Sequence, residues 1–360
     1  MTRKSVAMSR AITQPDLVAG FPRTRYQGSK RKLADSIVRC LDDLDYHSVL
    51  DAFGGSGAVS YAFKRSGKSV TYNDCLAFNH QFGVALIEND RVTLDVQTAA
   101  QLGRRIEGVE YRSVIEDTFD GVYFTRAENR WLDTAVVNLR RIPCRFQRAI
   151  AWFALCQSAM AKRPYNLFHR RNLYMRTSDV TRSFGNKATW DRSFENHVSV
   201  VVAETDDCIL DSGVACAALC QDAVSISPDF DLVYIDPPYI NRAGTGVDYR
   251  DFYHFLEGLL QYDTWSDLID RKSKHLRLVR EPSPWTNARQ NGTQFRNLFD
   301  RFRKSTLVVS YRSDGIPTID ELATWLRDVK RRVRIVEGET YQYALSKNRK
   351  SREVLLVATD

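Results

Sequence analysis

The sequence lacks the features that mark several large classes of protein. No apolar run approaches the ~20 residues needed to cross a bilayer, and no apolar stretch follows the basic first ten residues, so we expect neither a membrane span nor a secretory signal. The seven cysteines are odd in number and include no Cys-x-x-Cys pair, which favours reduced thiols over a disulfide framework or a zinc site. We therefore expect a cytoplasmic protein without a metal site, beginning with a flexible leader over residues 1–20.

A Gly-x-Gly-x-x-Gly dinucleotide fingerprint is also missing. Glycines that would let a nucleotide approach the backbone occur instead as Gly54-Gly55-Ser56-Gly57, directly after an apolar segment at 48–53 that is typical of a buried strand. Asp51 lies at the end of this segment, where a carboxylate would repel a pyrophosphate and attract a cation. The pattern argues against a dehydrogenase and favours a ligand with a positive group, such as S-adenosylmethionine.

The composition is that of a globular protein with one bias in charge. Of the 360 residues, 43% are hydrophobic and 27% are charged, which is enough for one large domain or two smaller ones with a proper core. The formal net charge is +8. A basic chain of this kind favours a polyanionic partner.

The segment around these glycines indicates half of a nucleotide-binding α/β fold. Apolar residues recur with helical spacing after Gly57 until Gly67, and a second strand at 69–72 ends at Asn73 and Asp74. Asp74 lies 23 residues after the first strand's acid, a position from which a carboxylate can bind ribose hydroxyls.

A second motif carries the chemistry. The apolar run 232–235 predicts a buried strand that stops at Asp236, Pro237, Pro238 and Tyr239, because prolines cannot continue a central ladder. The Asp236 carboxylate and the Pro237 carbonyl can accept the two hydrogens of an exocyclic amino group on a planar base, and Tyr239 can stack on the ring. Positioning and electrostatics would supply most of the catalysis, with no covalent enzyme intermediate and no metal ion.

Between 91 and 205 the alternation of strands and helices gives way to a mostly helical, arginine-rich pattern. Residues 161–192 contain eight lysines or arginines against two aspartates, with aromatic side chains between them. This composition suits phosphate contact and base readout. The predicted DNA-binding residues are Arg163, His169, Arg170, Arg171, Arg176 and Lys187.

The α/β pattern resumes near residue 218. We expect the polar loop 241–247 to be a mobile lid beside the site, and the basic, irregular stretch 271–293 to be a second loop near nucleic acid. The other predicted elements are helical material at 251–270, a strand at 306–311, a helix at 318–330 and closing strands at 332–336 and 353–358.

In type and order these motifs resemble those of the Dam-like (alpha-group) DNA adenine N6-methyltransferases, over roughly residues 21–360. The family's opening motif is similar to residues 25–30, its cofactor loop to 51–57 and its catalytic motif to 236–239. Segments of some members' recognition domains resemble 123–125, 168–174 and 183–187, and a late strand end resembles 310–313. The resemblance implies cofactor contacts from Tyr26, Lys30, Asp51, Phe53, Gly55, Gly57, Asp74, Asp222 and Asp236. Tyr26 and Ser29 stand where close relatives of Dam carry Trp and Gly, so the target sequence does not transfer.

The resemblance also implies an architecture and a reaction. The expected fold is α/β, a Rossmann-like S-adenosylmethionine-dependent methyltransferase sheet from 21–90 and 206–360, with an inserted, mainly helical DNA target-recognition domain at 91–205. The expected reaction is direct displacement of the methyl group onto N6 of a flipped-out adenine in double-stranded DNA. The implied setting is a bacterial or phage enzyme, a monomer or weak dimer. A restriction endonuclease that accompanied it would be a separate protein, and the sequence leaves open a restriction companion, an orphan regulator and a phage enzyme. The residues alone leave two other acceptors open, namely N4 of cytosine in DNA and an adenine in RNA.

Overall fold

The structure is a computed structural model that describes residues 16–180, 187–340 and 351–360. Most of the predicted leader and residues 183–186 of one recognition-domain segment lie outside the described residues. The last part of the predicted leader is attached to the body of the protein, because the Leu17 N–H donates to Asp35 at 3.0 Å and the Ala19 carbonyl accepts from Arg65 at 2.8 Å.

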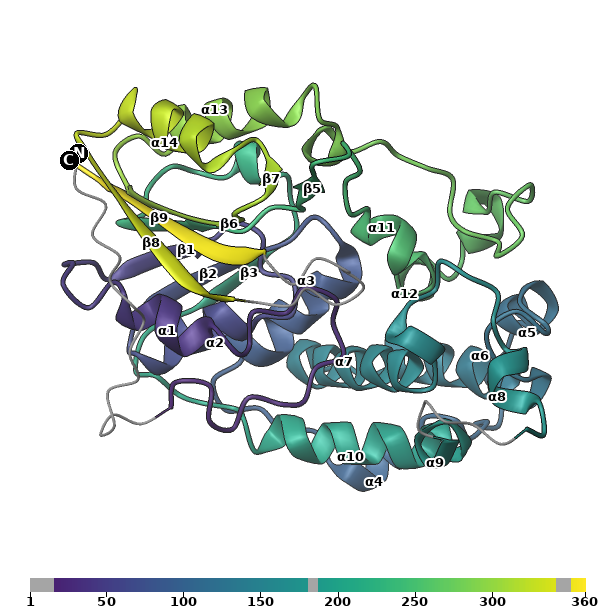
Figure 1. Cartoon of the computed structure of the whole chain (residues 1–360). Helices are drawn as coiled ribbons and strands as arrows, with labels where there is room; N and C mark the ends of the chain where they lie inside the picture. Colours follow the sequence, from purple (N-terminus) through teal and green to yellow (C-terminus); the bar gives the residue numbers. More distant parts are fainter. Residues whose placement is uncertain (1–15, 181–186, 341–350) are drawn as a thin grey trace.

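A seven-stranded sheet forms the centre of one half of the molecule (Figure 1), in the order β3-β2-β1-β4-β6-β9-β8. The strands from β3 to β6 are parallel, and β9 and β8 extend the sheet in antiparallel fashion. The mixed α/β architecture predicted from the sequence is therefore confirmed. The strands are β1 Ser48–Asp51, β2 Ser69–Asn73, β3 Ala217–Leu219, β4 Leu232–Ile235, β6 Thr306–Arg312, β8 Arg332–Thr340 and β9 Arg352–Thr359, with a separate pair formed by β5 Ile240–Asn241 and β7 Gly315–Ile316.

Helices cover both faces of this sheet, which explains why its strands are apolar on both sides. Leu50 and Val233 pack with α13 and α14 on one face, whereas Val49 and Val70 pack with α1, α2 and α3 on the other. The two sets of helices lie above and below the sheet in Figure 1. The α-helices are α1 Ala34–Arg39, α2 Ala58–Arg65, α3 Ala77–Gly83, α4 Val96–Ala100, α5 Val114–Thr118, α6 Arg126–Arg140, α7 Arg145–Ala161, α8 Tyr174–Thr177, α9 Lys187–Asp191, α10 Phe194–Asp206, α11 Tyr249–Phe252, α12 His254–Leu260, α13 Asn291–Arg301 and α14 Ile319–Arg327.

The order of the strands creates a switch point at the centre of the sheet. From β1 the chain moves outward to β2 and β3, and it then returns to form β4 on the other side of β1. In open α/β sheets, ligands bind at the carboxyl ends of the strands where the order reverses. Asp51 ends β1 and Asp236 follows β4, so both acids lie at this point.

The segment between β2 and β3 is mostly helical, as the sequence predicts. Its two long helices, α6 and α7, extend away from the sheet toward the small helices α5, α8 and α9 (Figure 1). Helix α7 also packs against α3, and its buried residues share one core with the sheet. The predicted division at residues 90 and 205 stays a prediction. Among the residues that the structure describes, no helix is long and apolar enough to span a membrane.

Candidate active site

A cavity of about 520 Å³ opens at the carboxyl ends of β1 and β4. Its walls are built from segments far apart in the sequence: the opening motif, the glycine loop, the end of β2, and the segment after β4. Every predicted catalytic and cofactor-binding residue except Gly57 lines it. Gly57 instead precedes helix α2 with a left-handed backbone (φ +80°). The structure thus brings together what the sequence places in four separate motifs.

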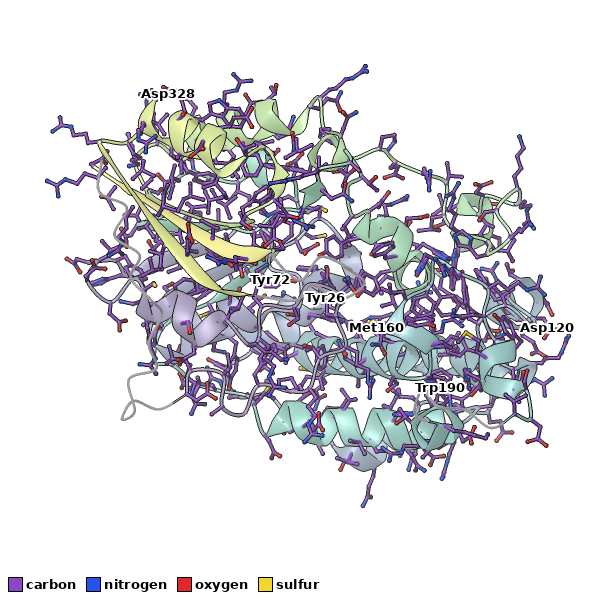
Figure 2. The ribbon with its side chains drawn as sticks, in the orientation of Figure 1. Tyr26, Tyr72, Asp120, Met160, Trp190 and Asp328 are labelled. Carbon is purple, nitrogen blue, oxygen red and sulfur yellow. The ribbon has the colours of Figure 1, made fainter. Side chains whose placement is uncertain are left out.

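The glycine loop leaves no room for side chains. A Cβ atom on Gly54 would lie 2.1 Å from the ring of Tyr72. Gly55 has a left-handed backbone (φ +51°), and a Cβ there would approach the Tyr26 ring to 3.3 Å. Figure 2 shows Tyr26 and Tyr72 close together near the middle of the molecule. Glycine at these two positions therefore lets the loop pack closely against the two tyrosine rings.

Asp51 is a buried carboxylate with one oxygen unused. Its Oδ2 accepts a hydrogen bond from the Ser60 hydroxyl at 2.6 Å, whereas Oδ1 is buried and has no partner among the described residues. Burial raises the pKa of Asp51 to about 7, because desolvation penalises the charged form. A cationic group in the cavity would favour the ionised form.

Asp74 is oriented by the backbone of its neighbours. Its Oδ2 accepts from the Gly55 N–H at 3.0 Å and its Oδ1 from the Leu76 N–H at 2.9 Å. Burial raises the pKa of Asp74 as well, and these hydrogen bonds act in the opposite direction. Asp222 lines the same cavity, where it caps a short 3₁₀ helix (Ala223–Ser225) by accepting from the Val224 N–H at 3.2 Å.

Aromatic rings build two sides of the cavity. Tyr26 stacks on Tyr253 and Tyr249 with ring centroids 5.1 and 5.7 Å apart. Phe53 meets Trp285 edge to face at 4.9 Å. Tyr249 and Trp285 are site residues that the sequence analysis missed. Tyr249 and Tyr253 are four residues apart, and this helical spacing could have indicated that both rings face the site. Trp285 lies in the stretch 271–293, which was expected to approach nucleic acid.

Asp236 is paired with a lysine from the opening motif. The Lys30 ammonium lies 2.8 Å from Oδ2 and 2.9 Å from Oδ1 of Asp236, and the Tyr239 hydroxyl donates to Oδ1 at 2.6 Å. Burial raises the pKa of Asp236, the charge of Lys30 acts to lower it, and the charge of Glu353 raises it further. Lys30 therefore contacts the catalytic motif, and its predicted contact with the cofactor stays a prediction.

Glu353 completes this cluster and was not predicted. It lies on β9 and is 5% exposed; its Oε1 lies 2.8 Å from the Tyr239 hydroxyl oxygen and accepts from the Ser310 hydroxyl at 2.6 Å. Its Oε1 is 3.6 Å from the Lys30 ammonium. The signal in the sequence was a single acid at the start of an otherwise apolar strand, which is rarely buried unless it has partners.

Comparison with known proteins agrees with this geometry. The sequence profile of the D12 class of N6 adenine-specific DNA methyltransferases matches residues 26–312, which include all the cavity motifs. The chain belongs to that family. This methyltransferase is 23% identical over 347 residues to the type II methyltransferase M2.HphI of Haemophilus parahaemolyticus. The aligned region covers 94% of the chain and 97% of that protein.

Two further relatives are longer proteins. The type II methyltransferase M.FokI of Planomicrobium okeanokoites is 22% identical over 84% of the chain, which spans 46% of that protein. The modification methylase LlaI of Lactococcus lactis subsp. lactis is 34% identical over 116 residues, or 31% of the chain and 17% of that protein. Membership of the D12 class confirms the Dam-like resemblance and selects adenine in DNA over the cytosine and RNA alternatives.

Two of the predicted DNA-binding residues of the methyltransferase are buried, which corrects the prediction. Arg163 is 1% exposed and donates to the backbone carbonyls of Tyr123, Leu167 and Arg170 at 2.8–3.3 Å. Burial lowers the pKa of its guanidinium to about 9. Arg163 therefore stabilises the local backbone conformation, and its guanidinium does not lie on the surface.

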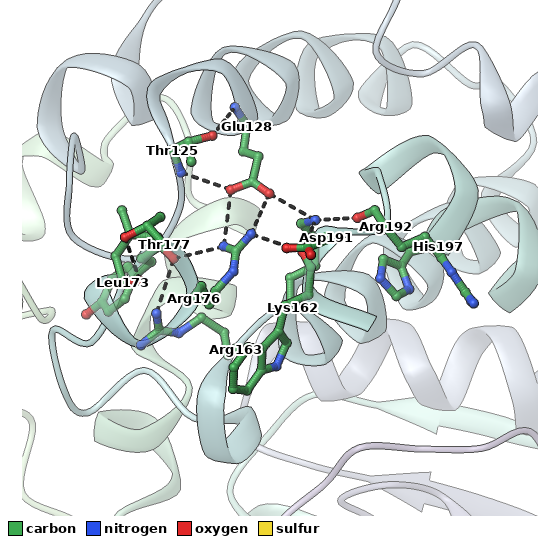
Figure 3. A network of polar contacts seen from close by, with 12 residues as sticks. Thr125, Glu128, Lys162, Arg163, Leu173, Arg176, Thr177, Asp191, Arg192 and His197 are labelled. Carbon is green, nitrogen blue, oxygen red and sulfur yellow. Dashed lines mark hydrogen bonds and ion pairs between the residues drawn. The ribbon is translucent and has the colours of Figure 1, made fainter. Parts of the chain in front are cut away.

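Arg176 belongs to a buried ionic network, shown in Figure 3. Its guanidinium pairs with the Glu128 carboxylate at 2.6 and 3.1 Å, and the Lys162 ammonium lies 2.9 Å from the same carboxylate. Burial acts to raise the pKa of Glu128, but Arg176 and Lys162 outweigh it and hold that pKa below its ordinary value. Arg176 is thus a structural residue, contrary to the prediction.

The remaining predicted DNA contacts are accessible to different extents. Arg170, Arg171 and Lys187 are exposed, and Lys187 pairs with Asp191 at 2.7 Å. His169 is half-buried against the ring of Phe252, with centroids 5.2 Å apart. Their contact with DNA stays a prediction.

Proposed function

We propose that this methyltransferase transfers the methyl group of S-adenosylmethionine to N6 of an adenine that is flipped out of double-stranded DNA, by direct displacement. The observation that carries the proposal is the shared cavity. The glycine loop after β1 and the segment Asp236–Tyr239 after β4 open into the same space at the switch point of the sheet. A cofactor and a base held there would be neighbours.

The residues around the glycine loop fit S-adenosylmethionine. Asp51 has a buried oxygen without a partner among the described residues and suits a cationic group. The backbone at Gly54 and Gly55 lines the cavity, and the Asp74 carboxylate beside it would accept the ribose hydroxyls. Phe53 and Trp285, with Asp222 nearby, form an apolar wall for a purine ring. When bound, this cofactor supplies a methyl group on a sulfonium centre.

The adenine would be held at the end of β4. The exocyclic nitrogen is a weak nucleophile because its lone pair is delocalised into the ring. The Asp236 carboxylate and the Pro237 carbonyl would accept its two hydrogens, while Pro238 keeps the backbone extended and Tyr239 offers a ring for stacking. Asp236 would take the proton that the nitrogen loses, since its raised pKa makes its carboxylate a stronger proton acceptor than an ordinary aspartate.

Base flipping follows from the depth of the site. Asp236 is only 15% exposed and lies within the cavity, so an adenine stacked inside a duplex could not reach it. The base must leave the helix to place its amino group against this carboxylate.

The surface expected to hold the duplex lies on the segment before α8. Tyr165 and Tyr174 are 53% and 67% exposed, and Arg170 and Arg171 lie between them. Exposed cations and aromatic rings together suit phosphate contact and contact with bases. Because relatives are named modification methylases, we propose in addition that a separate restriction endonuclease is the chain's partner.

The proposal is tested with purified protein, methyl-labelled S-adenosylmethionine and unmethylated genomic DNA. Digestion to nucleosides should place the label in N6-methyladenine. Label in N4-methylcytosine, or label incorporated only into RNA, would contradict it.

A further inference from the structure

One hydroxyl in the active site lies between two carboxylates. The Tyr239 oxygen is 2.6 Å from Asp236 Oδ1 and 2.8 Å from Glu353 Oε1. The Lys30 ammonium donates to the same oxygen at 2.5 Å. A phenol has a single hydrogen to donate, so it can satisfy only one carboxylate at a time.

Asp236 needs an oxygen free for its task. In the structure its Oδ1 accepts from both Tyr239 and Lys30, and its Oδ2 accepts from Lys30. An adenine amino group would compete with these donors. If the phenolic hydrogen turned to Glu353, Asp236 Oδ1 would lose one donor without movement of any heavy atom.

We propose that Glu353 is a positioning residue that takes over the hydrogen bond of Tyr239 when Asp236 accepts the adenine amino group. The proposal rests on the proposed function. Glu353 does not touch the base; it acts through the Tyr239 hydroxyl and by sharing Lys30. The cluster then has two arrangements of hydrogens on one fixed set of atoms.

The surroundings of Glu353 keep it in place for this task. β9 pairs with β6, which brings Glu353 opposite Arg312 in the register and within 2.6 Å of the Ser310 hydroxyl. Its side chain is 6% exposed, so water competes little for its oxygens. Among the described residues, the ionisable groups that face Glu353 or feel its charge are Lys30, Asp236, Tyr239, Tyr234 and Tyr249.

The charge of Glu353 has a second consequence that can be measured. Since it raises the pKa of Asp236, neutralising Glu353 removes a neighbouring negative charge and lowers that pKa. The ionised form of Asp236 is the acceptor. The acid limb of the rate profile should therefore move to lower pH when Glu353 is neutralised, even as the maximal rate falls.

The test compares Glu353→Gln with Glu337→Gln, an exposed glutamate on the neighbouring strand β8. Single-turnover methylation is followed against pH, and the Asp236 carboxyl is titrated by NMR in cofactor-free protein labelled with ¹³C-aspartate. For Glu353→Gln, which replaces a charged acceptor of the Tyr239 hydroxyl with a weaker neutral one, we expect an about tenfold lower plateau rate. We also expect an acid limb and an Asp236 titration that move to lower pH. Glu337→Gln should match the wild type in all three.

A double-mutant cycle with Tyr239→Phe isolates the route of the effect. If Glu353 acts through the hydroxyl, Glu353→Gln should slow a Tyr239→Phe enzyme much less than it slows the wild type. An unchanged or upward Asp236 titration in Glu353→Gln, or full additivity in the cycle, would overturn the inference. Absence of N6-methyladenine with wild-type protein would instead contradict the proposed function, and the NMR titration would still decide the role of Glu353.

Discussion

At the scale of single residues, two aspartates at neighbouring strand ends are prepared for different tasks. Asp51 is buried with one oxygen unpaired, whereas Asp236 is held by Lys30 and Tyr239. Both have raised pKa values, and burial is the main cause in each. The first suits a bound cation, and the second suits an amino group whose hydrogens need an acceptor.

Replacement of Asp236 by alanine should abolish transfer while leaving DNA binding largely intact. The carboxylate is expected to act on the reacting amino group and not on the phosphates, so the single-turnover rate should fall on the order of 1,000-fold. Gel-shift titration with a duplex substrate measures the binding side. Loss of DNA affinity in step with activity would contradict this division of roles.

Binding of S-adenosylmethionine should strengthen as pH rises through 7. The pKa of Asp51 is about 7, so its ionised fraction, which attracts the sulfonium, rises about tenfold between pH 6 and pH 8. Isothermal titration calorimetry should show a matching fall in Kd. Asp51→Asn should flatten that dependence, whereas Asp229→Asn, an exposed acid outside the cavity, should preserve it. Equal pH dependence in the two variants would contradict the role of Asp51.

At the scale of elements, a buried ionic network ties the predicted recognition segment to the helical core. The Glu128 carboxylate caps helix α6 by accepting from the Thr125 N–H. It also pairs with Lys162 at the end of α7 and with Arg176 in α8 (Figure 3). Lys162 also donates to the backbone carbonyl of Trp190 at 2.8 Å, next to the end of α9. The network around this carboxylate thus connects four helices.

Glu128→Gln should destabilise the protein by about 3 kcal/mol, because two buried cations lose their counter-charge. Urea unfolding at pH 7 measures this, with Glu107→Gln, an exposed glutamate, as control. The pKa of Glu128 is depressed in the folded state, so its contribution is present above its unfolded pKa and is lost as the pH falls through the folded value. The difference between the variants should therefore shrink in acid, and a constant difference would contradict the network's role.

Arg170 and Arg171 should contribute phosphate contacts. Their joint replacement by alanine should weaken DNA binding for all sequences and reduce the slope of log affinity against log salt concentration by about 2. The control is Arg327→Ala with Arg331→Ala, exposed arginines at and just after the end of helix α14, which lies on the opposite side of the molecule from α8 in Figure 1. An unchanged slope for the first pair would place the DNA elsewhere.

The sequence predicted the parts of the site that are local and missed those that the fold assembles. The acid and glycines after β1, and Asp236–Tyr239 after β4, are continuous motifs whose shape follows from strand ends, glycine and proline. Glu353 reaches the site because β9 pairs with β6. The spacing of residues along the sequence does not predict that strand pairing. Arg163 and Arg176 were misjudged because charge counts do not say which way an arginine points.

At the scale of the whole molecule, one core joins the sheet to the helices of the predicted recognition segment. Helix α7 packs on α3 beside the sheet and extends to the network at Lys162. The cavity and the ionic network at Lys162 are therefore joined by one continuous set of packed strands and helices.

The most direct test of this account is modification-sensitive sequencing of DNA from cells that express the wild-type chain or the Asp236→Ala variant, in a host without adenine methylation. The account predicts N6-methyladenine at one repeated sequence motif with the wild type and none with the variant. Methylation that persists in the variant, or that appears on cytosine, would contradict it.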